Sequence, residues 1–74
     1  MEKPLEEVVF IVEEAPEGGY IAKALGVSII TEADDLEALR SQVLDAVRCH
    51  FGDEKQRPRI IRLHMVKDEV LACA

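Results

Sequence analysis

Cys49 and His50 are the adjacent side chains in this sequence most able to do metal or nucleophilic chemistry, with His64 and Cys73 further along. Thiolate and imidazole groups bind zinc when four of them converge on one point. Neighbouring residues on a helix point about 100° apart, and the spacing of these four residues fits no common zinc pattern. We therefore expect no metal site and no cofactor, with Cys49 at least half-buried and His50 continuing the apolar stripe of a helix.

Catalysis by an acid, a base or a nucleophile has equally little support in the residue pattern. A Cys–His pair needs a third group that orients the histidine and a site for the oxyanion, and His64 has no evident carboxylate partner. The pair Asp34-Asp35 is explained by the start of a helix. A nuclease would need clustered carboxylates that bind Mg²⁺, whereas Glu7 and Glu13 flank a strand without forming an inward cluster. We therefore expect no enzymatic activity.

Gly18 and Gly19 could belong to a phosphate loop or to a turn. A phosphate loop has the form G-x-x-x-x-G-K-[ST] or G-x-G-x-x-G and leads from a strand into a helix. Here the glycines follow Pro16 and lead into the alternating run "GYIAKAL", residues 19–25. Proline and glycine in this order are typical of tight turns. The sequence therefore predicts that Gly18 and Gly19 form the bend of a β-hairpin.

The charge balance favours a protein partner over a nucleic acid. The 74 residues carry 9 basic and 15 acidic side chains, a formal charge of −6, which is the wrong sign for a general nucleic-acid binder. An acidic domain is steered toward basic partners, such as a small basic RNA-binding protein, although solubility alone also explains the charge. The basic residues Lys55, Arg57, Arg59 and Arg62 are interpreted as a solvated loop face or as an intersubunit salt-bridge patch.

Cysteine usage and hydropathy indicate a cytoplasmic protein. The two cysteines are not in C-x-x-C spacing, and no signal peptide is visible, so we expect reduced thiols. The longest apolar run, residues 8–12, is far shorter than the roughly 20 residues that a membrane span requires. We expect residues 1–74 to form a single domain with no membrane contact.

Hydrophobic periodicity predicts an α+β fold with the order strand, strand, strand, helix, strand. Strands are expected at residues 4–15, 19–25, 27–31 and 60–71, and a helix from about residue 35 to about residue 51. Gly26 breaks the second strand, Asp34 is the expected helix N-cap with Glu37 three residues later, and Gly52 is the expected helix stop. The first strand is apolar on both faces, so it should be central. A right-handed crossover then gives a four-stranded mixed sheet of order 3-2-1-4 with one helix on one face.

A single helix leaves the other face of this sheet uncovered. That face carries either Val8, Phe10 and Val12 or Val9 and Ile11, and such residues do not all stay in contact with water. We therefore expect a homo-oligomer, a dimer or larger, or a protein partner packed on that face or on an edge. The candidate interface residues are Val9, Ile11, Tyr20, Ala22, Lys23, Arg62 and His64.

Several motifs follow one another in a recognisable order: Glu17-Gly18-Gly19-Tyr20-Ile21-Ala22, Gly26, Thr31, Asp35-Leu36-Glu37-Ala38 and the helix "LRSQVLDAVRCHF". Over roughly residues 5 to 66 this order resembles the HicB-like antitoxin domain of toxin–antitoxin systems. The resemblance implies a truncated ribonuclease-H-like sheet with one helix. It also implies a protein-binding role, in which the domain neutralises a small basic RNA-cleaving toxin of the HicA type by covering its active surface.

Two features depart from the family pattern. Family members often have a "P-D-L-P-G" segment after the second strand, where this sequence has Lys23-Ala24-Leu25-Gly26. Many members also carry a DNA-binding domain after the sheet, and since this sequence stops at Ala74 we expect no operator binding. The alternative to an antitoxin is a solitary, self-associating structural or regulatory protein with no toxin and no enzymatic activity.

Overall fold

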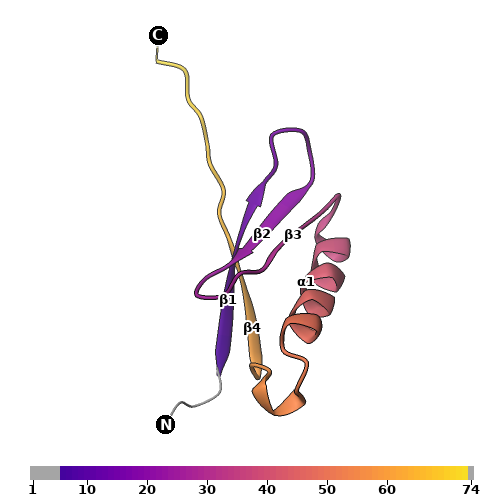
Figure 1. Ribbon diagram of the computed structural model, residues 1–74. Coiled ribbons are helices and arrows are strands. Elements are labelled where there is room, and N and C mark those ends of the chain that lie inside the picture. The colour runs from indigo at the N-terminus through magenta and orange to yellow at the C-terminus, as the bar shows by residue number, and fades with distance from the viewer. Residues whose placement is uncertain (1–5, 74) are drawn as a thin grey trace.

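The computed structural model describes residues 6–73. It contains one sheet, one long helix and one short 3-10 helix (Figure 1). The elements are β1 (Glu7–Glu14), β2 (Tyr20–Ala24), β3 (Ile30–Ala33), α1 (Leu36–His50), η1 (Glu54–Gln56) and β4 (Ile60–Met65). The fold is α+β, with the elements in the predicted order.

The sheet has the predicted strand order β3-β2-β1-β4. β1 is central: it pairs antiparallel with β2 and parallel with β4, while β2 pairs antiparallel with β3. The double-sided apolar character of β1 and the preference for short connections were sufficient to predict this arrangement. β3 and β4 are the two edges of the sheet.

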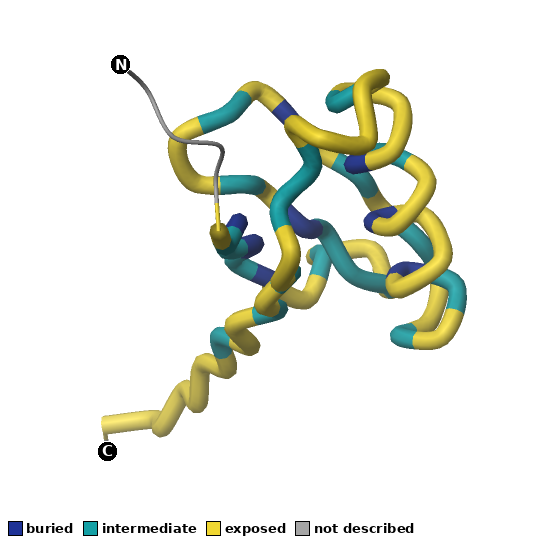
Figure 2. The backbone as a smooth tube through the Cα atoms, turned by 90° about the horizontal axis from the view of Figure 1, so that it is seen from below, coloured by how far each residue is buried: buried dark blue, intermediate teal, exposed yellow. Residues whose placement is uncertain are grey.

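The core lies between the sheet and α1. Val8, Phe10 and Val12 of β1 point toward α1 and are almost completely buried, because alternate residues of a strand face opposite sides. They pack with the helix residues Leu39, Val43 and Val47 and with Ala22 and Ile29. Figure 2 shows these buried segments meeting between the helix and the strands. Of the two sets that the sequence allowed on the uncovered face, Val9 and Ile11 therefore occupy it.

The bend between β1 and β2 is the predicted glycine turn. Gly18 and Gly19 have φ values of 103° and 81°, in the region that glycine adopts without a side-chain clash. The Gly18 N–H donates to the Ala15 carbonyl at 3.0 Å, and the Ala15 N–H donates to the Gly19 carbonyl at 2.9 Å. Gly26, with φ 84°, serves the bend after β2.

The predicted range of α1 agrees with the structure within one residue at each end, but the capping details need correction. The N-cap is Asp35, not Asp34: its Oδ1 accepts from the Ala38 N–H at 2.7 Å, and its backbone is extended. This is the geometry of an N-cap one residue before the first helical residue. At the other end Phe51 is the C-cap, and Gly52 is not among the described glycines with positive φ. Gly52 therefore does not close the helix by a left-handed cap.

All four predicted strands have different limits in the structure. β1 and β2 are shorter than the predicted ranges 4–15 and 19–25, and residues 4 and 5 of the first range lie outside the described residues. The last two strands differ more. β3 runs from Ile30 to Ala33 rather than from residue 27 to residue 31. The Ile29 N–H turns back to the Val27 carbonyl at 3.0 Å, although the Ile29 carbonyl still accepts from the Ala24 N–H of β2 at 2.9 Å. β4 ends at Met65 rather than at residue 71. The Val66 N–H still donates to the Val12 carbonyl at 2.8 Å, but β1 turns into its hairpin soon afterwards and offers no further partner.

Candidate functional site

The candidate site begins with the sheet face that points away from α1. Val9 and Ile11 of β1 lie on it, and cross-strand pairing puts Lys23 of β2 and His64 of β4 on either side of Ile11. Arg62 of β4 pairs with Val9 in the same way. The structure therefore brings five of the seven candidate interface residues together on one face.

This face carries more apolar surface than the candidate list indicated. Ile30 of β3 is 71% exposed and Ile60 of β4 is 52% exposed, with Val9, Ile11 and Ile21 half-buried between them. In the register these aliphatic side chains alternate with Lys23, Arg62 and His64. Exposed aliphatic side chains gathered on one sheet face are typical of a protein-binding surface. The alternation of residues along β2 and β3 could have identified Ile21 and Ile30 as residues of this face. Ile21 lies two residues before Lys23 on β2, and Ile30 pairs with Lys23 across the strands.

Charged residues surround the apolar part of this face. Arg62 donates from its Nε to Glu7 Oε1, and this hydrogen bond together with the negative charge of Glu7 raises the pKa of the Arg62 guanidinium. Glu13 and Glu32 lie further along the same face, with Ile21 between them in the pairing. Arg62 is thus engaged within its own chain, which leaves Lys23 as the freely exposed cation of the face among the described strands.

Two of the candidate interface residues lie on the opposite side of the sheet. Ala22 has no exposed surface and belongs to the core beneath α1, so its assignment to an interface is corrected by the structure. Tyr20 is half-buried and packs against the same core. Alternation along β2 puts residues 20, 22 and 24 on one face and residues 21 and 23 on the other. The list of candidate interface residues included both Ala22 and Lys23, so it combined residues from two faces.

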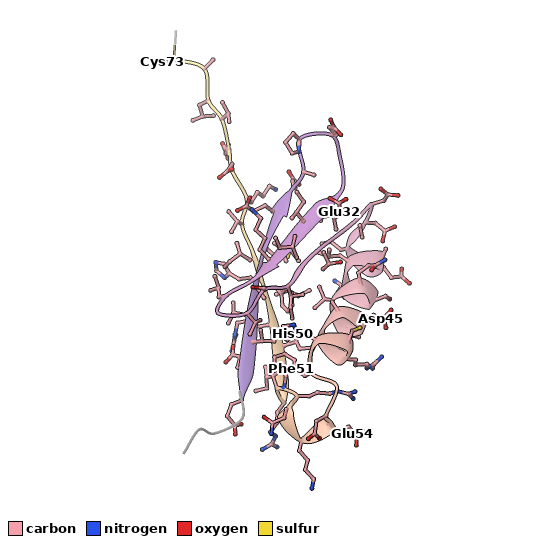
Figure 3. All side chains as sticks on the ribbon, viewed as in Figure 1. Glu32, Asp45, His50, Phe51, Glu54 and Cys73 are labelled. Carbon is pink, nitrogen blue, oxygen red and sulfur yellow. The ribbon has the colours of Figure 1, made fainter. Side chains whose placement is uncertain are left out.

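An acidic hollow lies at the end of the sheet where the β1–β2 hairpin meets the connection from β3 to α1. It has a volume of about 680 Å³, and Glu17, Tyr20, Glu32 and Asp34 are among its lining residues. Figure 3 shows Glu32 at this end of the molecule. Two segments supply the carboxylates: Glu17 comes from the hairpin, and Glu32 and Asp34 come from β3 and the residue after it. This is why no local motif in the sequence predicted the hollow.

The cysteine and histidine residues do not form a site. Cys49, His50, His64 and Cys73 are all exposed, and Figure 3 shows His50 far from Cys73. Within residues 6–73, no group of three or more His, Cys, Asp or Glu side chains could hold a metal ion. The expectations that Cys49 is at least half-buried and that His50 joins the apolar stripe are wrong, since the stripe ends at Val47.

The basic loop is partly used inside the chain. The Arg57 Nε donates to the Phe51 carbonyl at 2.9 Å, which satisfies a backbone acceptor at the end of α1. Arg62 is paired with Glu7. Lys55 and Arg59 are exposed. Two of the four cations therefore have structural partners, so a salt-bridge patch of all four against another subunit is not supported.

Together these features define a small α+β domain: one mixed four-stranded sheet, one covering helix and an open, partly apolar sheet face. No helix in the described part of the chain is long and apolar enough to cross a membrane. The chain is 50% identical over 56 residues to a UPF0150 protein of Archaeoglobus fulgidus, covering 76% of this chain and 82% of the relative. It is 40% identical over 67 residues to a UPF0150 protein of Thermotoga maritima, covering 90% and 93% of the two chains.

The chain belongs to the UPF0150 family, which includes HicB-like proteins. No family model matches it. No solved structure matches it either.

Proposed function

We propose that this domain is a HicB-like antitoxin-type binding module that acts in the cytoplasm. Its partner is a small basic RNA-cleaving protein of the HicA type, and the domain neutralises it by covering its active surface. The observation that carries the proposal is the acidic end of the sheet, where Glu17, Glu32 and Asp34 line one hollow beside the open face. The membership of HicB-like proteins in the same family supports it.

The chemistry of the surface fits such a partner. A protein that binds RNA presents lysine and arginine side chains to the phosphates, and the carboxylates of the hollow are acceptors for the same groups. The net charge of −6 steers a basic partner toward this domain before contact. Ile21 lines the hollow and also lies on the open face, so one partner can contact carboxylates and aliphatic side chains together.

The proposal assigns no catalytic role to this chain. Glu7 and Glu13 are six residues apart on one strand, about 20 Å along it, and Glu7 is paired with Arg62. A pair of carboxylates this far apart does not share a metal ion, since a two-metal centre places its ions about 4 Å apart. Incubation of the purified chain with RNA and Mg²⁺ or Mn²⁺ should give no cleavage, and metal-dependent cleavage would contradict this part of the proposal.

The proposal expects the neighbouring gene to encode a small basic protein, and co-expression of the two chains tests it. We expect a stable complex, relief of the growth arrest that the partner causes alone, and loss of its RNA cleavage in vitro. The variant Glu17→Lys should weaken the complex at least tenfold, while Glu54→Lys should bind as the unaltered chain does. Glu54 is a matched control because it is exposed and acidic but lies in η1, at the other end of the molecule.

Absence of a complex, or equal effects of the two charge reversals, would contradict the antitoxin proposal. The second candidate function is then a solitary self-associating protein with a structural or regulatory role. The unpaired edge of β4 favours it, because a free strand edge is a surface for assembly with another chain.

A further inference from the structure

β4 is an edge strand whose outer backbone groups have no partner strand within residues 6–73. Natural proteins usually protect such an edge with proline, a bulge or charged side chains. Residues 60–65 contain no proline, and Arg62, their one lysine or arginine, is engaged by Glu7. The edge is therefore open to pairing with another strand.

The chain continues past this edge as an extended segment, residues 66–73, which Figure 1 shows leaving the sheet in the direction of β4. The side chain of Leu71 in this segment is not covered and is 79% exposed. Free aliphatic side chains at this level of exposure are unfavourable in water. The segment therefore lacks a packing partner in the single chain.

The dimensions of the chain indicate the same incompleteness. Its radius of gyration is 14.5 Å, whereas a compact domain of 74 residues has about 11 Å. Its accessible surface is 6104 Å², whereas a monomer of 8.3 kDa exposes roughly 4,600 Å². The chain therefore exposes more surface than a compact monomer of its mass, and a standard interface needs only roughly 800 Å² from each partner.

An apolar hollow lies directly beside the free edge. α1 packs mainly on β3 and β2, which leaves a space of about 220 Å³ between α1 and β4. The hollow is lined by Arg40, Val43, Leu44, Ile61 and Leu63. A strand added to β4 would place its helix-side residues at this hollow.

We propose that two copies of this chain pair β4 to β4, antiparallel, about a twofold axis perpendicular to the sheet. Residues 66–73 of each copy then lie along Ile60–Met65 of the other. The lengths agree, because eight extended residues span about 26 Å and the six residues of β4 span about 20 Å. The product is one continuous sheet with both helices on the same side, and its interface is the same surface on each copy.

The side chains select the register. The twofold axis keeps residues 61, 63 and 65 on the helix side in both copies, so opposite residues must both be odd or both be even. With Val66 on the axis, Ile61 lies opposite the partner's Leu71, and that leucine fills the hollow. Leu63 then lies opposite the partner's Glu69, at the hollow that Arg40 also lines. Arg40 forms no ion pair with another described residue. In the proposed dimer the carboxylate of the partner's Glu69 is the ion-pair partner of Arg40.

The neighbouring registers are less favourable. With Lys67 on the axis, two ammonium groups would lie directly opposite each other, which destabilises a strand pair. With Met65 on the axis, Ile61 would lie opposite the partner's Glu69 and the leucine would miss the hollow. The chosen register also puts His64 opposite the partner's Asp68, on the open side of the sheet, where an aspartate can accept from the imidazole N–H. This dimer requires no toxin, so it is independent of the proposed function.

Light scattering after size exclusion tests the assembly. The full chain at about 50 μM should have the mass of a dimer, and a chain that stops after Val66 should have the mass of a monomer with an unchanged circular dichroism spectrum. Leu71→Asp should raise the dissociation constant at least tenfold. Val70→Asp is the control, because residue 70 lies on the open side opposite the partner's Arg62, where a carboxylate meets a guanidinium, and it should leave the dimer intact.

Cross-linking tests the register. In a Cys49→Ser/Cys73→Ser background, the variants Met65→Cys, Val66→Cys and Lys67→Cys would be oxidised mildly. Directly opposite residues have Cβ atoms about 5 Å apart, close enough for a disulfide after a small shift, so we expect Val66→Cys to give the predominant cross-linked dimer. A monomeric full chain, a dimeric truncated chain, equal effects of the two aspartate substitutions, or predominant cross-linking at position 65 or 67 would overturn the proposal.

Discussion

Replacement of Gly19 by alanine should be far more damaging than the same replacement at Gly26. Both glycines have nearly the same backbone conformation, with φ values of +81° and +84°. They differ in what a Cβ atom would meet. At Gly19 it would lie 2.6 Å from the Ala33 carbonyl oxygen and 3.3 Å from the Asp34 Cα, whereas at Gly26 nothing lies within 4 Å. A comparison of Gly19→Ala with Gly26→Ala therefore separates the stability lost through steric overlap from the stability lost through backbone strain.

The expected magnitudes follow from this difference. A left-handed conformation costs an alanine roughly 1–2 kcal/mol, which is the whole expected loss for Gly26→Ala. At Gly19 the overlap is with backbone atoms, which cannot move aside as a flexible side chain can. Forced repacking typically adds roughly 1–3 kcal/mol, so Gly19→Ala should lose about 2–5 kcal/mol in all. A domain of this size has a total free energy of unfolding of about 4–11 kcal/mol. The loss expected for Gly19→Ala is a large part of that total.

Urea denaturation followed by circular dichroism measures the difference. With a slope near 1 kcal/mol per molar urea, typical of small domains, the midpoint of Gly19→Ala should lie at least 1 M below that of Gly26→Ala. Both variants must be compared at one protein concentration, because any self-association shifts the apparent stability. Equal midpoints would refute the reasoning that Gly19 is required by its close approach to the connection between β3 and α1.

Three further predictions concern the fold and use the same denaturation assay. Phe10→Ala should lose about 3–5 kcal/mol, because the ring has no exposed surface and a cavity would replace it. Asp35→Ala should lose about 1 kcal/mol because it removes the helix N-cap, while Asp34→Ala should change stability by less than about 0.5 kcal/mol. A larger loss for Asp34→Ala than for Asp35→Ala would show that Asp34 is the N-cap, as the sequence predicted. Arg57→Ala should lose about 1 kcal/mol with its hydrogen bond to the Phe51 carbonyl, and no loss would show that water replaces the guanidinium there.

The strand order was predictable from the sequence because few arrangements satisfy its constraints. β1 is apolar on both faces and must be central, and the helix between β3 and β4 requires a crossover to a parallel position. The glycine turn was predictable for a local reason, since Pro16 and Gly18 favour a bend in almost any context. These parts of the fold depend on local patterns and on chain connectivity alone.

The details that failed depend on distances between segments. Asp34 and Asp35 have the same capping chemistry, and only the exact start of α1 decides between them. Cys49 is exposed because α1 presents a narrow stripe to the sheet, which a list of apolar positions does not reveal. The acidic hollow combines Glu17 of the hairpin with Glu32 and Asp34 from the end of β3, so it became visible only when these two segments were placed together.

The last strand shows how one wrong boundary leads to an inference about assembly. The sequence predicts a strand from residue 60 to residue 71, yet pairing within the chain ends at Met65 because β1 turns away. A second copy in the proposed register supplies the missing partner for the remainder of that strand. It does so at the β4 edge, which leaves Glu17 and Glu32 at the hairpin end free to meet a basic protein. A Leu71→Asp chain that no longer dimerises should therefore still bind that protein, since the two surfaces share no residue.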